Sequence, residues 1–297
     1  MPKALPQPPL ACRFARKLGH GSDFKGKDRL LRLLCDPDRI ADTPFAAPFW
    51  DGQTYRGNLA VLMDWWVYVY GGYEIGLIEA IRAIAAELPR PSAFVDIGLN
   101  AAHHSLAVCR RFDRVIGFEA HPEVFAQAGR RLAENGIENA ELLNMAVADK
   151  AGILTLHTFE DGAHNRGTST LVGKRFAGGR EIAVPAVALD DSYIRARLDP
   201  FAALFLKIDV EGAEHLVLAG ARRLIAEKRP VIYCETDGPV KLRPLVEADY
   251  RLQPVRGYYK RLRLLPPGRE DTMDWLCFPA EREDLLGVLR RQAFVSG

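Results

Sequence analysis

Five short apolar runs alternate with helical stretches across the middle of the chain, and this alternation constrains the fold more than any other feature. The runs cover residues 93–97, 114–119, 140–145, 203–208 and 230–235. Such alternation is typical of βαβ units, in which helices cover both faces of a parallel sheet. The sequence therefore predicts an α/β protein with a doubly wound, mostly parallel sheet. Two later runs, 250–254 and 273–278, predict a late antiparallel pair.

The first run ends in a tight turn that suits a cofactor. Asp96 is its one polar residue, and Gly98, which has no Cβ, follows where the chain turns toward a helix beginning near His104. The dinucleotide pattern G-x-G-x-x-G, counted from Gly98, would need glycine where the chain has Asn100 and His103. A cofactor without a pyrophosphate does not need those glycines, so the turn favours S-adenosylmethionine over a nicotinamide cofactor.

The second run ends with a carboxylate, whose distance along the chain from Gly98 fits the same cofactor. Glu119 lies 21 residues after Gly98, the spacing at which an acidic side chain accepts the ribose hydroxyls of a bound nucleotide. A turn glycine and a strand-end carboxylate each have a purely structural explanation. Together, at this spacing, they favour a cofactor site.

Three carboxylates follow the fourth run. Asp209 ends a strand that is expected beside the first one, so it should face the same crevice as Gly98. Glu211 and Gly212 are expected to open the next helix. Glu214 would then lie inside the first turn, where backbone amides and the helix dipole would satisfy its carboxylate.

Residues 1–70 are interpreted as an extension with a small cap, and residues 71–297 as the main domain. Four prolines among the first ten residues argue against folded structure there, whereas residues 27–34 predict a helix and residues 45–58 a hairpin. Eight Lys and Arg against two Asp lie between residues 1 and 34. They indicate either a solvated basic helix or a surface for an acidic partner.

A polar loop, residues 161–170, separates two β-like runs at 153–159 and 181–187. Its length and composition indicate either a substrate-facing insertion or the mobile tip of a hairpin.

Composition and cysteine spacing narrow the class of protein. The 297 residues carry a net charge of +2 with 26% charged residues, which gives no reason to expect nucleic acid. The longest apolar stretch near the start, residues 59–70, is too short to span a membrane, and no signal peptide is recognisable. Five cysteines form no C-x-x-C pair. We interpret them as reduced thiols of a cytoplasmic protein, without a disulfide framework or a metal site: Cys12, Cys35, Cys109, Cys234 and Cys277.

Three motifs give the chain a specific resemblance. Phe94-Val-Asp-Ile-Gly-Leu-Asn100, Val115-Ile-Gly-Phe-Glu119 and Lys207-Ile-Asp-Val-Glu-Gly-Ala-Glu214 resemble the FkbM-type family of S-adenosylmethionine-dependent methyltransferases. The resemblance covers roughly Gly72 to Phe278 and includes Val187-Ala-Leu-Asp190. It implies a seven-stranded, Rossmann-like class I methyltransferase sheet with an antiparallel seventh strand. It also implies methylation of hydroxyl groups on sugars, glycans, lipids or secondary metabolites.

The resemblance assigns roles position by position. The residues implied to bind the cofactor are Asp96, Gly98 and Asn100 at the methionyl part, Glu119 at the ribose, and Asn144 or Ala146 at the adenine. Transfer from a sulfonium to a hydroxyl oxygen depends on positioning and on a base that removes the hydroxyl proton. Candidates for that base are Asp209, Glu211 and His104.

Other classes of function stay open beside this one. Leu99 and Ala102 replace the alanine and glycine usual in the family's turn, and we expect them to narrow the loop at the methionyl end. A cofactor-binding module that has lost turnover is therefore one alternative, and a nicotinamide oxidoreductase another. A nucleic-acid methyltransferase is a third, because residues 256–263 interleave aromatic and basic side chains. A late hairpin with a solvated face also explains that stretch.

Overall fold

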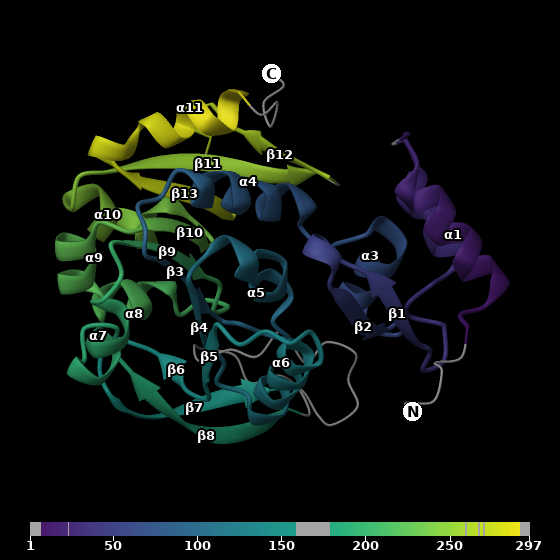
Figure 1. Ribbon diagram of the computed structural model, residues 1–297, viewed down its shortest axis with the longest axis horizontal. Coiled ribbons are helices and arrows are strands. Elements are labelled where there is room, and N and C mark those ends of the chain that lie inside the picture. Colours follow the sequence, from purple (N-terminus) through teal and green to yellow (C-terminus); the bar gives the residue numbers. More distant parts are fainter. Residues whose placement is uncertain are drawn as a thin grey trace. The chain divides into compact units, whose positions relative to one another are not determined.

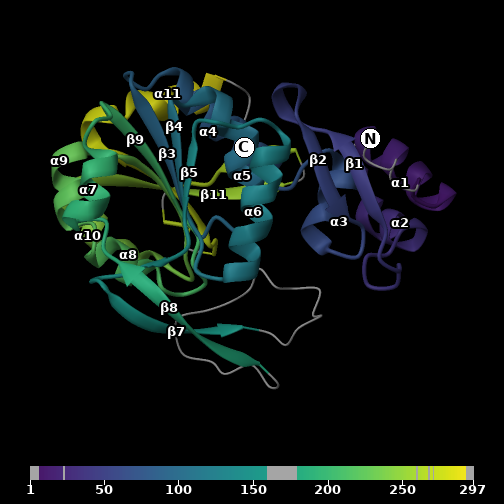
Figure 2. The same ribbon diagram turned by 60° about the horizontal axis from the view of Figure 1, so that its bottom comes forward.

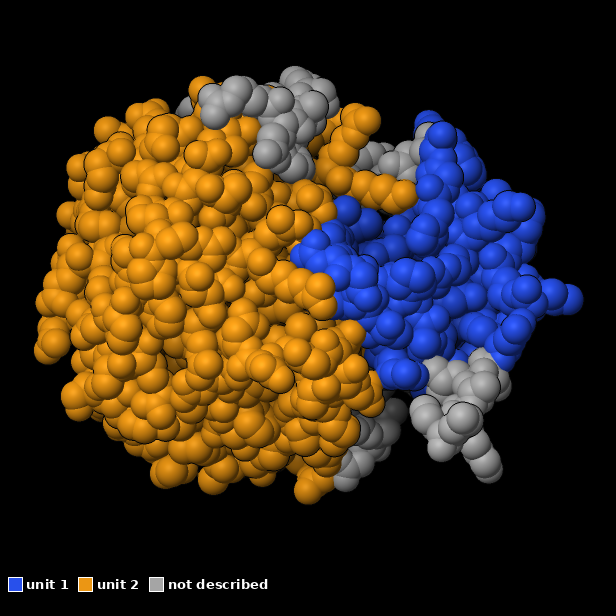
Figure 3. Space-filling model, viewed as in Figure 1, with its two compact units in different colours: residues 1–75, 162–165 blue, residues 76–161, 166–297 orange. Residues whose placement is uncertain are grey.

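The computed structural model describes residues 7–22, 24–158, 179–258, 260–266, 268–269 and 271–291. The chain divides into two compact units, of which the first ends at Ile75 and the second begins at Gly76 (Figure 3).

The first unit combines an antiparallel hairpin with helices. Its elements are α1 (Leu10–His20), α2 (Lys27–Leu34), β1 (Pro44–Pro48), β2 (Thr54–Asn58) and α3 (Leu62–Tyr70). Both the helix expected at 27–34 and the hairpin expected at 45–58 are confirmed, whereas α1 had no counterpart among the expectations. α3 packs against α1 and β2 and buries Trp65 completely.

A buried acid explains the single charge in the apolar stretch 59–70. The carboxylate of Asp64 accepts a hydrogen bond from the Tyr55 hydroxyl at 2.6 Å and another from the Asn58 N–H at 2.9 Å. Both donors belong to β2, so this carboxylate ties α3 to the hairpin. A buried carboxylate without such donors would strongly destabilise the unit.

The expectation that all five cysteines are reduced thiols is wrong. Cys12 on α1 forms a disulfide with Cys35, the residue after α2, and their Cα atoms are 4.8 Å apart. The pair is separated by 23 residues, and only the packing of α1 beside α2 brings it together. Disulfides persist mainly in oxidising compartments, so the argument for a cytoplasmic protein from reduced thiols no longer holds. Cys109, Cys234 and Cys277 are free and buried.

The second unit is built on one large sheet (Figure 1). Its strands are β3 (Ser92–Ile97), β4 (Arg114–Phe118), β5 (Ala140–Leu143), β9 (Ala203–Ile208), β10 (Val231–Glu235), β11 (Tyr250–Tyr258), β12 (Arg261–Leu264) and β13 (Asp274–Pro279). The order is β12-β11-β13-β10-β9-β3-β4-β5, and the strands from β10 to β5 are parallel. β13 runs antiparallel to both of its neighbours, β10 and β11.

This topology confirms the predicted fold class. All five core strands predicted from apolar runs are present, and β13 is the antiparallel strand that the resemblance implied. β12 adds an eighth strand, paired with β11 in the late hairpin. β4 and β5 lie on one side of β3 while β9 and β10 lie on the other, so the strand order reverses at β3. Open α/β sheets bind their ligands at such a switch point.

Helices cover the central strands on both faces. Figure 2 shows α4 (Ile75–Ala86), α5 (His103–Val108) and α6 (Pro122–Glu134) on one side of β3 and β4. On the other side lie α7 (Ser192–Leu198), α9 (Arg222–Lys228) and α10 (Arg243–Glu247). The remaining described helices are α8 (Glu214–Ala219) and α11 (Asp284–Arg291). Every residue of β3 and β9 is buried, as expected for parallel strands covered on both faces.

A second, smaller sheet follows β5. β6 (Ala146–Val147), β8 (Arg180–Val187) and β7 (Gly152–Thr158) pair in that order, and β7 runs antiparallel to β8. The two β-like runs expected on either side of a polar loop are therefore confirmed. The loop itself, residues 161–170, lies outside the described residues.

Candidate functional site

The turn after β3 needs glycine at one position for two reasons. Gly98 has φ +80°, a left-handed conformation that side chains disfavour. A Cβ at this position would also lie 1.8 Å from the carbonyl oxygen of Asp209, the residue that follows β9. The backbone after β3 therefore lies directly against the backbone after β9, as expected for the ends of two neighbouring parallel strands.

Glu119 holds this turn through its carboxylate. It follows β4; one oxygen accepts a hydrogen bond from the Asn100 N–H and the other from the His121 N–H, both at 2.8 Å. Burial raises the pKa of Glu119 to about 7, although the two backbone donors oppose the rise. Each carboxylate oxygen can accept a further hydrogen bond, so capacity for two more donors remains.

Asn144 and Ala146 lie close to Glu119 along the same edge of the sheet. The Asn144 amide donates hydrogen bonds to the carbonyl oxygens of Glu119 at 2.8 Å and Ala120 at 3.2 Å. Ala146 is buried and begins β6. The Asn144 side chain thus fixes the backbone that carries the Glu119 carboxylate.

A buried lysine joins two carboxylates between β3 and β9. The Lys207 ammonium lies 3.0 Å from the Asp209 carboxylate, 3.6 Å from that of Asp96 and 3.5 Å from the Gly98 carbonyl oxygen. The other Asp96 oxygen accepts a hydrogen bond from the Ser105 hydroxyl at 2.7 Å. The side chains of Lys207 and Asp96 are only 2% and 1% exposed, so each depends on its partners for charge compensation.

Lys207 opens the third of the family motifs, but the sequence did not lead us to expect a role for it in the site. The signal was present, because a lysine in the middle of an apolar strand has to be paired when that strand is buried. Arg131 on α6 was also missed: its guanidinium donates to the Ala101 carbonyl oxygen at 2.6 Å and so holds the turn from the helix side. Nothing in the sequence spacing joins residues 101 and 131.

The helix after β9 starts later than expected. Glu211 and Gly212 have φ of +48° and +102°, so neither is helical, and α8 begins at Glu214. The Glu214 carboxylate accepts the Gly212 N–H at 2.6 Å and pairs with the Lys241 ammonium at 2.9 Å. A lysine from a distant segment therefore neutralises this buried carboxylate, which we had expected to rely on backbone amides and the dipole.

The three base candidates have different environments. Asp209 is held by the Lys207 ammonium. Glu211 is exposed in the segment after β9; partial burial of its carboxyl raises its pKa, and the charges of Asp209 and Glu214 raise it further. His104 lies buried in α5, with its ring 5.3 Å from that of His103.

The two departures from the family's usual turn are also placed. The Leu99 side chain lies over β4, where its methyl groups would be 3.0 Å from a Cβ on Gly117. This contact directs Leu99 onto the neighbouring strand and leaves its expected narrowing of the loop without structural support. Ala102 has φ +59°, a left-handed conformation in which glycine would be less strained.

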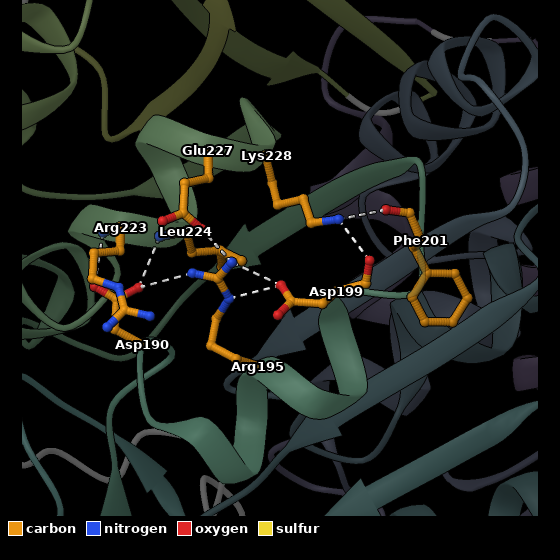
Figure 4. Close-up of polar contacts among 8 residues, drawn as sticks. All are labelled: Asp190, Arg195, Asp199, Phe201, Arg223, Leu224, Glu227 and Lys228. Carbon is orange, nitrogen blue, oxygen red and sulfur yellow. Dashed lines mark hydrogen bonds and ion pairs between the residues drawn. The ribbon is translucent and has the colours of Figure 1, made fainter.

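Asp190, in the motif before β9, has a structural role. Its carboxylate accepts the N–H groups of Arg223 and Leu224, both at 2.8 Å, and so caps the start of α9 (Figure 4). Arg195 on α7 lies beside this cap and also bridges Asp199 and Glu227 (Figure 4). The network joins α7 to α9.

Two features are absent from the described residues. Among those residues no group of three or more His, Cys, Asp and Glu side chains is arranged to hold a metal ion. Among them, too, no helix combines the length and apolar character that crossing a membrane requires.

The fold is that of a doubly wound, Rossmann-like α/β protein with one mostly parallel sheet. The family model described as the methyltransferase FkbM domain matches residues 96–252, more than half of the chain. The chain therefore belongs to the FkbM methyltransferase family.

Individual relatives are distant. The methyltransferase sdnD of Sordaria araneosa is 29% identical over 190 residues, covering 55% of this chain and 73% of the relative. The FkbM methyltransferase structure from Methylobacillus flagellatus KT is 16% identical with a TM-score of 0.40, covering 90% of this chain and 58% of that one. This chain thus spans little more than half of that structure. A precorrin-6y C5,15-methyltransferase from Geobacter metallireducens GS-15 is 12% identical with a TM-score of 0.37, covering 67% and 84%.

Proposed function

We propose that this protein is an S-adenosylmethionine-dependent methyltransferase that methylates a hydroxyl oxygen on a sugar, glycan, lipid or secondary metabolite. Membership of the FkbM family supports the reaction class. The observation that carries the cofactor assignment is the Glu119 carboxylate, fixed by two backbone donors beside the Gly98 turn.

The residues around the turn fit this cofactor. Ribose has two adjacent hydroxyl donors, and the Glu119 carboxylate has two oxygens with acceptor capacity left. The turn from Gly98 to Asn100 would hold the methionyl part, and Asn144 and Ala146 would border the adenine. Asp96 supports the turn from the protein interior, because its side chain is buried against Ser105 and Lys207.

The chain's own residues then supply the base and its positioning. The cofactor, when bound, presents a methyl group on a sulfonium, and the acceptor hydroxyl must lose its proton as its oxygen takes that methyl. Glu211 is the base that the environment favours, because a carboxylate with a raised pKa is better matched to proton removal near neutral pH. Asp209, paired with Lys207, orients the acceptor. His104 is the weaker candidate because it is buried.

Calorimetric titration of the full chain with S-adenosylmethionine tests the proposal. Glu119→Ala should weaken binding by about 1.5–3 kcal/mol, the range for a lost hydrogen bond to a charged group. Glu138→Ala, which removes an exposed carboxylate in the turn before β5, is the matched control and should bind like the unaltered protein. Absence of binding at millimolar S-adenosylmethionine, together with binding of NADH, would show that the site belongs to a nicotinamide enzyme.

A further inference from the structure

Large apolar side chains are exposed on the outer faces of α1 and α2. Leu10 and Phe14 on α1 are 78% and 54% exposed, and Leu33 on α2 is 84% exposed. Leu30 and Phe24 are 37% and 48% exposed. These five make up half of the large apolar side chains that are exposed among the described residues, although the two helices and their connection form a small part of the chain.

The apolar side chains share one face of each helix. On α1, Cys12, Ala15 and Gly19 are buried against the unit, and Leu10 and Phe14 lie on the opposite side at a spacing of four residues. On α2, Lys27 and Leu31 are buried, and Leu30 and Leu33 lie on the outer side. Each helix therefore has an inner face that packs against the rest of the unit and an outer face on which apolar side chains are exposed to solvent.

Basic side chains accompany these apolar ones. Arg13, Lys17, Lys25 and Arg29 are all exposed. Residues 10–34 contain seven Lys and Arg against two Asp, of which Asp28 accepts a hydrogen bond from the Tyr70 hydroxyl. The outer surface of α1 and α2 thus carries a net positive charge.

The two helices are fixed to each other. The Cys12–Cys35 disulfide links α1 to the end of α2, and the Lys27 ammonium donates to the carbonyl oxygens of Gly19 at 2.9 Å and Gly21 at 3.0 Å. The two helices are therefore held together before anything binds, and binding does not require them to be ordered first.

We propose that this surface, formed by the outer faces of α1 and α2, docks onto an anionic lipid bilayer. Apolar side chains flanked by Lys and Arg are the pattern of helices that lie in the headgroup region, where leucine and phenylalanine enter the acyl boundary and the cations meet lipid phosphates. A second copy of the chain would bring positive charge against positive charge. Nucleic acid would pair with the cations and leave the leucines in water.

Sedimentation of the full, oxidised protein with vesicles tests the proposal. Vesicles of phosphatidylcholine alone are compared with vesicles of one part phosphatidylserine to two parts phosphatidylcholine. The protein should bind the anionic vesicles, less strongly as salt is added. Lys17→Gln with Arg29→Gln should weaken binding by roughly 25-fold, about fivefold for each cation. Phe14→Gln with Leu33→Gln should weaken it by at least ten-fold.

Matched controls place equivalent changes in the second unit. Ile153→Gln with Val246→Gln alters two side chains that are 71% and 54% exposed. Arg130→Gln with Arg222→Gln removes two exposed cations. Both controls should bind vesicles like the unaltered protein, and thermal melting checks that each variant is folded.

Three results would overturn the proposal. The first is no binding of the unaltered protein to anionic vesicles. The second is equal losses in the control variants, which would mean that vesicle binding does not depend on α1 and α2. The third is sedimentation of a dimer that only Phe14→Gln with Leu33→Gln dissociates, with no vesicle binding, which would make a second copy the occupant. None of these measurements involves S-adenosylmethionine, so failure here leaves the proposed methyltransferase function untouched.

Discussion

Glu119 is the residue whose environment makes the proposed site sensitive to pH. Burial raises its pKa to about 7 in the free protein, so its carboxyl binds a proton that the unfolded chain would release near its ordinary value. Hydroxyl donors prefer the ionised carboxylate. A ligand that offers two hydroxyls therefore has to displace that proton when the pH is below 7.

We expect the affinity for S-adenosylmethionine to rise with pH up to about 7 and then to level off, with a slope of up to tenfold per pH unit below that value. The stability of the free protein should change in the opposite direction, because a raised carboxyl pKa favours the folded state at low pH and this contribution is lost as pH rises to 7. Calorimetry at several pH values measures the first effect. Glu119→Gln should abolish the dependence, and a dependence that survives this substitution would assign it to another group.

Lys207 is the second residue whose substitution should have a large effect, here on stability. Lys207→Met leaves the carboxylates of Asp96 and Asp209 without their shared cation, and breaking a buried pair in this way costs about 3–5 kcal/mol of unfolding free energy. Adding Asp96→Asn should recover part of the loss. Lys228→Met, which removes one exposed and one part-buried hydrogen bond to backbone carbonyl oxygens, is the control and should cost about 1 kcal/mol in urea unfolding. Equal losses for the two lysines would contradict the buried pairing.

At this scale the sequence predicted only what is local. Gly98, Asn100 and Glu119 could be found because two successive strands and the turn between them fix their spacing. The partners Asp96 and Lys207 are 111 positions apart, and the contact of Arg131 with Ala101 depends on how α6 packs. No periodicity carries such information.

The element that decides the proposed chemistry is the segment from Asp209 to Glu214, between β9 and α8. Two of its residues are in left-handed conformations, which brings the Gly212 N–H to the Glu214 carboxylate. Left-handed non-glycine residues gather at functional sites when the surrounding structure holds them in place. Glu214 and Lys241 hold this segment, because both contact the Gly212 backbone and pair with each other.

Glu211→Gln and Glu214→Gln should therefore have opposite effects. Glu211→Gln should leave the free energy of unfolding unchanged and lower kcat by about 10²–10⁴-fold, as expected for loss of a general base. Glu214→Gln should cost about 1–3 kcal/mol of stability, because it removes the buried charge partner of the Lys241 ammonium and leaves that ammonium paired with Asp237 alone. The measurements are urea unfolding and turnover on an acceptor found by screening sugars, glycans and lipids. A silent Glu214→Gln enzyme of normal stability would reverse the assignment.

Strands and helices were predicted correctly where the apolar pattern is strong. A helix start was misplaced where the backbone conformation determines where the helix begins. The buried runs located all five core strands, and Pro122 at the first helical position located α6. The start of α8 was placed three residues early, because acidic residues favour a first helical turn but do not reveal a positive φ.

At the scale of the whole molecule, the two units depend on different sources of stability. The second has a large core around its sheet. The first is small, and small units bury too little apolar surface to be very stable on core packing alone. The Cys12–Cys35 disulfide is the feature that compensates for this.

We expect Cys12→Ser with Cys35→Ser to destabilise the first unit by about 3 kcal/mol, the entropy of closing a loop of this length in the unfolded chain. Thiol titration in denaturant gives an independent measurement. Three thiols should react before reduction and all five after it. Five reactive thiols in the unreduced protein would show that this pair is open.

The short strand β12 has a consequence for solubility. Without it, the nine residues of β11 would form the edge of the sheet, and their unpaired N–H and C=O groups could template pairing with another molecule. β12 covers the last four residues of β11, from Val255 to Tyr258, and its exposed Arg261 and Arg263 face solvent. At β12 a strand of a neighbouring molecule would meet only four residues, two of them exposed arginines, so growth of the sheet into fibres is disfavoured there.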